Sequence, residues 1–420
     1  MGIHSLRVIL RSDFKGVPGT SNKQDLINLI LKTQAGEEIP VRSTKGRKPL
    51  DVTVSMGDRE FVFCDVGEGP NGETCWTKGV FEKHENGYGY VRGEDCYISK
   101  NDAFVRETFV KRAGLKTGDI VEGECDGYGD RGGYTLRNSA FVNGKALDDG
   151  ANKEDTTPLV KPVKEKINLG GQDGILNAVD TFCPIGKGQR CLVVGEDNSF
   201  TTDLTKRLLK AINDSGEDLS VTALLVGAKP EIAVELKESF SKNVVLVDFN
   251  EDASVAVRIC KLAIQSVKNK VKNGRHHVLI IDRISAILKC LREYLAGDKT
   301  DKFISENINA ERFILDAFGC GGNMGEEKSL TIFAVANDLE DGLYKNLLEV
   351  SNAVINLKGE GKIRKRTYKL DVQNSWSDSD EILHGAEKIA RIDSLREEMC
   401  SSLEKEESIW QKFKNGEIEL

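Results

Sequence analysis

The chain has 420 residues, of which 39% are hydrophobic and 30% charged, and its formal net charge is −8. One hydrophobic core rarely serves such a length, so we expect several domains. The negative charge excludes a general attraction to nucleic acid, and any such binding must rest on local geometry. No run approaches the eighteen apolar residues of a membrane span. Ten scattered cysteines without a CxxC pair favour a cytoplasmic protein with reduced thiols.

The periodicity of apolar residues and the glycine content change several times along the chain. Ser21 and Gln24 form a capping box ahead of a short helical pattern. Between Trp76 and Val142, short alternating runs separated by glycines predict a small β-barrel. We expect a helical N-terminal subdomain at 1–35, a linker or extension at 36–75, a barrel at 76–145, a linker at 146–166, an α/β core at 167–375 and a helical tail at 376–420.

The second half alternates apolar runs with helical patterns such as Asp252–Val271. Continuous apolar strands interleaved with helices predict a parallel sheet covered on both faces. We expect His276 and His277 to form a surface turn rather than a metal site, because no Cys or carboxylate follows them at ligand spacing. The expected strands are 191–195, 221–226, 243–249, 277–282 and 329–335.

A group of aromatic residues in the barrel segment is the first candidate site. Strand alternation places Tyr88, Tyr90 and Arg92 on one face, and Tyr97 can lie beside them on an adjacent strand. Clustered aromatic rings with an arginine suit a surface on which RNA bases stack, at about 1–3 kcal/mol per base. The alternative is that these tyrosines form part of the core or plain cross-strand pairs. We favour the stacking surface, although the spacing itself leaves both interpretations open.

Residues 79–123 resemble the cold-shock-type RNA-binding domain of the bacterial transcription termination factor Rho family. The segment 183–190 (CPIGKGQR) is similar to the entry into the RecA-like ATPase of that family. The resemblance implies an OB/cold-shock barrel followed by a RecA-like α/β domain. It also implies contact with single-stranded RNA, RNA polymerase and other Rho subunits in a homo- or hetero-oligomeric, hexameric ring, with ATP and magnesium as cofactors and no membrane. The positions that match RNA-contacting residues of the family are Tyr88, Tyr90, Arg92, Asp95 and Tyr97.

The expected phosphate-binding loop departs from the family pattern. Such a loop needs glycines for curvature, a lysine for the phosphates and a Ser or Thr for magnesium. The Ala-Gly-Lys-Thr of the family aligns here with 199–202, which read Ser-Phe-Thr-Thr. Only Thr202 is left as a magnesium ligand, and Glu196 and Asp197 add negative charge where a triphosphate would lie. The residues that line this degenerate pocket are then Asn198, Phe200, Thr201, Thr202 and Asp282.

Other catalytic positions of the family also differ. Ala228 aligns with the glutamate that polarises the attacking water, and Gly359 aligns with the arginine finger, which Arg364 or Arg366 could replace. Asp282 matches the Walker B aspartate. It either holds magnesium through water or remains as a relic that ends a strand. Losing these groups removes charge stabilisation at several points of the phosphoryl-transfer transition state.

These observations predict a Rho-like termination factor that binds single-stranded RNA, binds ATP weakly or not at all, and regulates termination without hydrolysis. It could join or cap Rho rings, or compete for RNA. The alternative is an active RNA-dependent ATPase and helicase that terminates transcription with a divergent phosphate loop. A third reading is a structural ring component without RNA affinity.

Overall fold

The chain divides into two units, Met1–Phe61 and Val62–Leu420, and the computed structural model describes parts of the second. The described residues are 67–68, 75–126, 134–146, 161–171, 173–215, 218–240, 243–272, 276–297, 309–325, 328–360 and 367–418. The helical subdomain expected at 1–35 therefore lies outside them, as does nearly all of the extension expected at 36–75.

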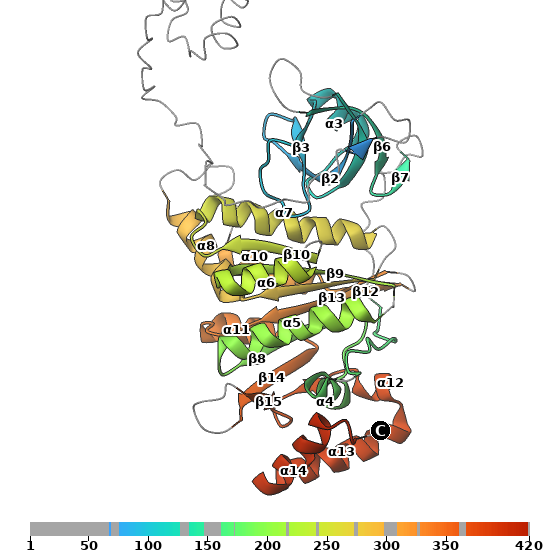
Figure 1. The fold of residues 1–420 in the computed structure, drawn as a ribbon, viewed down its shortest axis with the longest axis vertical. Helices are drawn as coiled ribbons and strands as arrows, with labels where there is room; N and C mark the ends of the chain where they lie inside the picture. The colour runs from blue at the N-terminus through green and yellow to red at the C-terminus, as the bar shows by residue number, and fades with distance from the viewer. Residues whose placement is uncertain are drawn as a thin grey trace, which may run out of the picture. The chain divides into compact units, whose positions relative to one another are not determined.

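A closed β-barrel forms the first part of the described chain (Figure 1). Five strands follow one another in the order β2-β3-β4-β6-β5, and β5 pairs back onto β2. All of these pairings are antiparallel except that of β4 with β6, which gives an OB-like barrel. Its elements are β1 (Gly67–Glu68), β2 (Cys75–Lys83), β3 (Gly89–Arg92), β4 (Ala103–Val105), α3 (Glu107–Ala113), β5 (Ile120–Asp126), β6 (Tyr134–Val142) and β7 (Lys145–Ala146).

Alternation along the barrel strands sends small and branched side chains inward. Phe81 of β2 and Val91 of β3 are fully buried in this core. A glycine is required at position 89, because a Cβ there would lie 2.3 Å from the ring of Phe81. Gly89 therefore lets β3 approach β2 closely, and the residues on either side of it point their side chains outward.

The second part is an α/β domain built on a mostly parallel sheet. Its central strands run parallel in the order β10-β9-β11-β13-β8-β14, with β15 added antiparallel to β14. The five expected strands are confirmed, because each is an apolar run buried between layers of helices. The strands are β8 (Arg190–Gly195), β9 (Leu219–Ala228), β10 (Val244–Asp248), β11 (His276–Asp282), β12 (Gly322–Gly325), β13 (Lys328–Val335), β14 (Ala353–Gly359), β15 (Tyr368–Leu370) and β16 (Trp376–Ser377).

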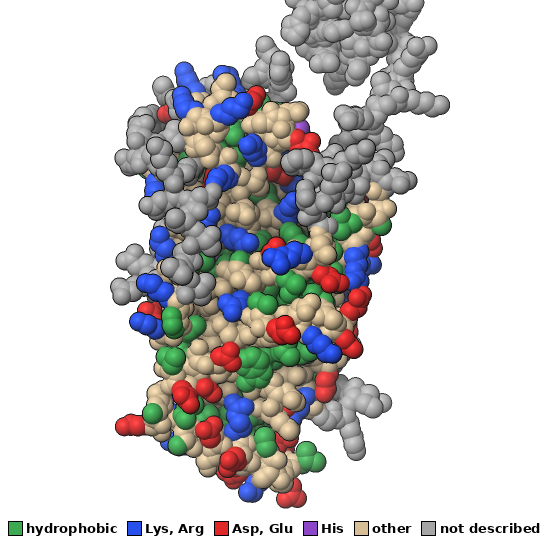
Figure 2. All heavy atoms as spheres, turned by 180° about the vertical axis from the view of Figure 1, so that it is seen from behind, with side chains coloured by type: hydrophobic (Ala, Val, Ile, Leu, Met, Phe, Trp, Pro, Cys, Tyr) green, Lys and Arg blue, Asp and Glu red, His purple; other side chains and the backbone are tan. Residues whose placement is uncertain are grey.

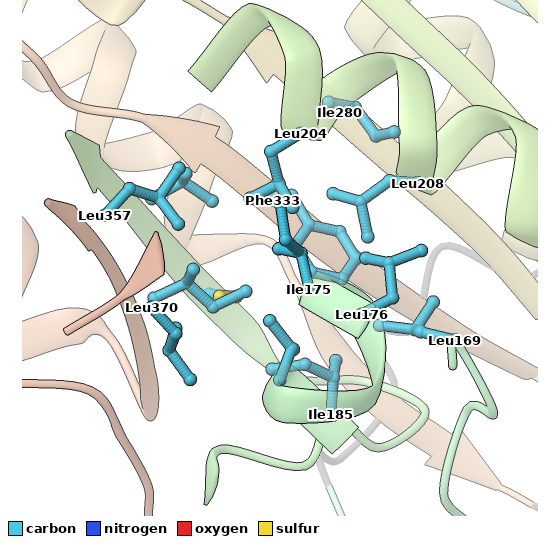
Figure 3. Close-up of a cluster of buried hydrophobic side chains, with 14 of the residues drawn as sticks. Leu169, Ile175, Leu176, Ile185, Leu204, Leu208, Ile280, Phe333, Leu357 and Leu370 are labelled. Carbon is cyan, nitrogen blue, oxygen red and sulfur yellow. The ribbon is translucent and has the colours of Figure 1, made fainter. Parts of the chain in front are cut away.

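Helices cover both faces of this sheet. One apolar cluster lies between the sheet and α4, α5, α6 and the C-terminal helices, and Figure 3 shows part of it, with Phe333 beside Leu204 and Leu208. A second cluster lies between the other face and α7, α8, α10 and α11. The helices are α4 (Gly174–Phe182), α5 (Asn198–Asp214), α6 (Pro230–Phe240), α7 (Ala253–Lys272), α8 (Ile284–Ala296), α10 (Ala310–Gly319), α11 (Asp341–Val350), α12 (Asp380–His384), α13 (Ala386–Ser401) and α14 (Leu403–Lys414).

The C-terminal helices pack onto the α/β domain. Trp410 of α14 is fully buried, and its indole N–H donates a hydrogen bond to Glu360. Lys414 also binds Glu360, at 2.8 Å. The helical tail expected beyond Asp378 is thus an integral part of the domain. Among the described helices, none is both long and apolar enough to cross a membrane.

The expectation that His276 and His277 form a surface turn is wrong. Both residues belong to β11, and His277 is only 2% exposed. Its Nε2 atom lies 3.0 Å from the hydroxyl oxygen of Thr222 on the neighbouring strand β9. Burial, helped by nearby Lys270, lowers the pKa of His277 to about 3, so the ring is neutral. A polar partner across the sheet explains why a histidine can lie in an otherwise apolar strand.

Candidate functional site

The barrel carries a cluster of aromatic side chains on its outer surface. The ring of Tyr88 lies 5.9 Å from that of Tyr90 and 5.4 Å from that of Phe104, and the rings of Tyr90 and Phe104 are 5.7 Å apart. Tyr90 and Phe104 are direct cross-strand neighbours on β3 and β4. All three side chains are half-buried, so each ring keeps an accessible part. We call these three residues the aromatic cluster.

Arg92 lies next to Tyr90 on the same face of β3, and it is buried rather than exposed to solvent. Its guanidinium lies 4.6 Å from the ring centre of Tyr90 and pairs with Glu82 at 2.7 Å and with Asp102. Burial would lower the pKa of Arg92, but the two carboxylates raise it above its usual value. A buried, doubly paired arginine on the same outer face of β3 therefore supports the Tyr90 ring and fixes its orientation.

The structure places Asp95 and Tyr97 elsewhere. Both lie in the loop between β3 and β4, and Tyr97 packs against the apolar cluster that contains α7. Burial raises the pKa of the Tyr97 hydroxyl, and the nearby carboxylates of Glu251 and Asp248 raise it further. Burial also raises the pKa of Asp95, against the opposing charges of Lys237 and Arg258. These two residues therefore face the α/β domain, and Tyr97 does not occupy the adjacent strand that the sequence suggested.

Phe104 is the aromatic residue that the sequence analysis missed. The signal was present, because Ala103 and Val105 on either side of it are fully buried. An alternating small-aromatic-small run directs the middle ring to the outer face of the barrel. Phe104 thus completes the surface begun by Tyr88 and Tyr90.

The segment that follows β8 differs in shape from a phosphate-binding loop. Only Glu196 and Asp197 separate β8 from the first residue of α5. The carboxylate of Asp197 caps that helix by accepting a hydrogen bond from the backbone N–H of Ser199 at 2.7 Å. The carboxylate of Glu196 accepts a hydrogen bond from the backbone N–H of Gly359 at 2.9 Å. The carboxylate of Asp197 thus occupies a donor at the helix end where an anion would bind, and the carboxylate of Glu196 is held by strand β14.

The other residues of the expected nucleotide pocket make contacts within the protein. The ring of Phe200 stacks on Tyr368 at 5.2 Å and is nearly buried. The hydroxyls of Thr201 and Thr202 donate to the backbone carbonyl of Asn198 at 3.1 and 2.9 Å. The hydroxyl expected to bind magnesium is therefore used inside the helix. These residues do not fit a magnesium–triphosphate group, because cationic donors are absent from 195–202 and the helix end is capped internally.

Asp282 and Ala228 end two neighbouring strands. Asp282 closes β11 and is 2% exposed, and its Oδ1 atom has no hydrogen-bond partner among the described residues. Burial raises the pKa of Asp282 to about 6, and the adjacent Arg283 opposes this rise. Arg283 itself has a left-handed backbone, with φ of 70°, and donates to the carbonyl of Gly227. Ala228, at the end of β9, is buried and offers no group that could act on water.

The comparisons with known proteins agree with this architecture. The RNA-binding domain of Rho termination factor matches residues 77–148, which span the barrel and carry the aromatic cluster. Transcription termination factor Rho of Chromobacterium violaceum is 26% identical over 368 residues, which cover 83% of this chain and 87% of that protein. The Escherichia coli K12 factor of the same name is 24% identical over 83% of this chain and 86% of its own length. Most of the chain is therefore similar to Rho termination factors, and its barrel matches their RNA-binding domain.

Two further observations complete the comparison. An ATPase of the type III secretion system of pathogenic bacteria shares 15% identity with this chain, and the match covers 64% of the chain and 78% of the ATPase, with a TM-score of 0.47. Among the described residues, no group of His, Cys, Asp or Glu side chains forms a metal site. The aromatic cluster thus lies within the segment that matches the Rho RNA-binding domain.

Proposed function

We propose that this chain is a Rho-family protein that binds single-stranded RNA on the aromatic cluster and regulates transcription termination without hydrolysing ATP. The observation that carries the proposal is the internal cap of α5, where Asp197 holds the N–H of Ser199 at 2.7 Å. A triphosphate would have to displace this carboxylate and that of Glu196, and no lysine lies in the loop to compensate.

RNA binding is supported by the rings that the barrel presents. Tyr88, Tyr90 and Phe104 are half-buried rings in contact with one another, and bases can stack on the parts that remain exposed. Arg92 adds its charge next to Tyr90 but is neutralised by two carboxylates. Stacking would therefore supply most of the affinity of the aromatic cluster, with a modest contribution from phosphate attraction.

A protein with these properties would act by binding RNA or Rho subunits, and not by hydrolysing ATP. It would hold the nascent RNA in the cytoplasm, join or cap a ring of active Rho subunits, or compete with such a ring for RNA. Each route needs the barrel and none needs a phosphoryl-transfer site. RNA polymerase is a further partner that membership of the family suggests.

The test combines two assays on one preparation. Fluorescence anisotropy with a mixed-sequence single-stranded oligoribonucleotide measures RNA affinity, with and without ATP and magnesium. We expect binding that Tyr90→Ala weakens and that nucleotide leaves unchanged. RNA affinity that rises or falls with ATP in the parent chain, but not in Asp282→Ala, would contradict a nucleotide-independent role.

One observation favours a second candidate, an active ATPase with a divergent loop. Asp282 is buried with an unpartnered Oδ1 atom at the end of β11, where a Walker B aspartate would lie. Unpartnered buried carboxylates are costly and are often kept for a ligand. This candidate requires RNA-stimulated phosphate release that is lost in Asp282→Ala.

A further inference from the structure

A groove of about 770 Å³ lies between the barrel and the amino ends of β9 and β11. We call it the interdomain groove. Lys78 of β2 and Lys145 of β7 line it from the barrel, and Lys270 of α7 and His277 of β11 line it from the α/β domain. It lies away from the carboxyl ends of β8 and β11, where the nucleotide region is found.

The lysines give the groove a positive character in a chain of net negative charge. Glu94 is the acidic residue among those that line the groove. Lys78 lies 3.2 Å from Glu122, but its side chain remains 60% exposed. Neither Lys145 nor Lys270 forms an ion pair with any described residue. Figure 2 shows Lys and Arg side chains gathered on the barrel and on the part of the α/β domain next to it.

A buried polar group also lines the groove. The Nδ1 atom of His277 has no hydrogen-bond partner in the described part of the chain, although the residue is almost fully buried. Its other nitrogen lies 3.0 Å from the hydroxyl of Thr222. When Thr222 donates that hydrogen bond, Nδ1 of the neutral ring carries a proton and can donate to an oxygen. A ligand with an acceptor oxygen would satisfy this group.

The floor of the groove is apolar. Val80 and Ile120 of the barrel and Leu219 and Val221 of β9 line it. The groove thus combines an apolar surface with several lysines. This combination suits a ligand in which flat, uncharged groups are linked by negatively charged groups. A single-stranded nucleic acid has this pattern, because its bases alternate with phosphates.

We propose that the interdomain groove binds single-stranded RNA as an extension of the aromatic cluster, with phosphates held by Lys78, Lys145 and Lys270. The three lysines come from three different elements, which suits an extended polyanion better than one small anion. This inference rests on the proposed function, since it concerns the same RNA. The groove determines how many nucleotides the chain covers, whereas the aromatic cluster holds the bases first bound.

The experiment compares oligoribonucleotides of 4 and 16 nucleotides at several salt concentrations. The variant is Lys78→Gln with Lys145→Gln and Lys270→Gln, and the charge-matched control is Lys289→Gln with Lys405→Gln and Lys412→Gln on α8 and α14. For the longer RNA we expect the groove variant to bind less tightly. The slope of log affinity against log salt should fall by about 2, at roughly 0.7 per phosphate contact. The tetranucleotide should bind the variant as it binds the parent chain.

Three results would decide the matter. Replacing the same lysines by arginine should restore the salt slope, which separates lost charge from damaged folding. An unchanged slope in the glutamine variant, or an equal loss with the 4-nucleotide RNA, would overturn the groove while leaving the aromatic cluster intact. Failure of the parent chain to bind either RNA would instead remove the proposed function itself.

Discussion

Arg258 of helix α7 donates a hydrogen bond to Glu82 of barrel strand β2 at 3.1 Å. The same carboxylate oxygen accepts a hydrogen bond from Arg92, which lies next to the ring of Tyr90. Glu82 is therefore shared between the support of the aromatic cluster and the contact with the α/β domain. The Nε and Nη2 atoms of Arg258 are buried without partners among the described residues, so this contact depends strongly on the charge of Glu82.

Glu82→Gln should destabilise the protein by about 2–3 kcal/mol, because it leaves the buried Arg92 and the partly buried Arg258 with one counter-charge fewer. The exposed pair of Glu107 and Lys111 provides the control, and Glu107→Gln should cost under about 1 kcal/mol. Urea unfolding measures both values. A double-mutant cycle with Arg258→Met should return a clear coupling energy. Additive effects would show that the Glu82–Arg258 contact carries no stability.

The two tyrosines on either side of Arg92 should behave differently. Tyr90→Leu removes a ring of the aromatic cluster and should weaken RNA binding by about 1–3 kcal/mol, or roughly ten- to a hundredfold. Tyr97→Leu keeps an apolar side chain in the domain contact and should leave RNA affinity within about threefold. Anisotropy titrations compare the two variants. Equal losses would mean that Tyr97 also stacks on RNA, as the family resemblance implied.

Asp197 should act as a helix cap and not as part of a ligand site. Asp197→Ala removes the acceptor for the N–H of Ser199 and should cost about 1 kcal/mol of stability. Ser402→Ala at the start of α14, where the serine accepts from the N–H of Lys405 at 3.3 Å, is the matched cap removal. Neither variant should change RNA affinity. A loss of RNA binding in Asp197→Ala alone would contradict this assignment.

Asp282 should make stability depend on pH. Its pKa is about 6 in the folded state, against 3.8 for an aspartate in solvent, so between about pH 4 and 6 the folded chain binds more protons than the unfolded chain. Stability from this group is therefore greatest at low pH and is lost as pH rises from about 4 to 6. Asp282→Asn should raise stability at pH 7.5 by about 1–3 kcal/mol and change it little at pH 4. Thermal unfolding at both pH values provides the measurement, and a destabilised variant at pH 7.5 would show that the charged form is needed.

Much of the α/β domain could be predicted because its strands are continuous apolar runs between helical patterns. The barrel could be predicted from alternation and glycines, and Tyr88, Tyr90 and Arg92 do come together. Domain contacts could not be predicted in this way. Nothing in local periodicity distinguishes Tyr90, on the outer face of a strand, from Tyr97, whose loop packs against α7.

The nucleotide region shows a second limit of sequence reasoning. The sequence shows that the expected phosphate-binding loop lacks a lysine, but it does not show which groups bind the backbone N–H donors of this region. Glu196 binds Gly359, 163 residues away in the chain, and such pairs depend on the sheet order that places β8 beside β14. His277 was misjudged for the same reason, because Thr222 lies on another strand. Long-range polar pairs decide these sites, and one-dimensional patterns do not contain them.

Phosphate release from ATP, measured with the purified chain saturated by single-stranded RNA, tests the central claim most directly. We predict release no faster than that of a reaction without protein, and no difference between the parent chain and Asp282→Ala. Rapid RNA-stimulated release by the parent chain, abolished in Asp282→Ala, would contradict the account.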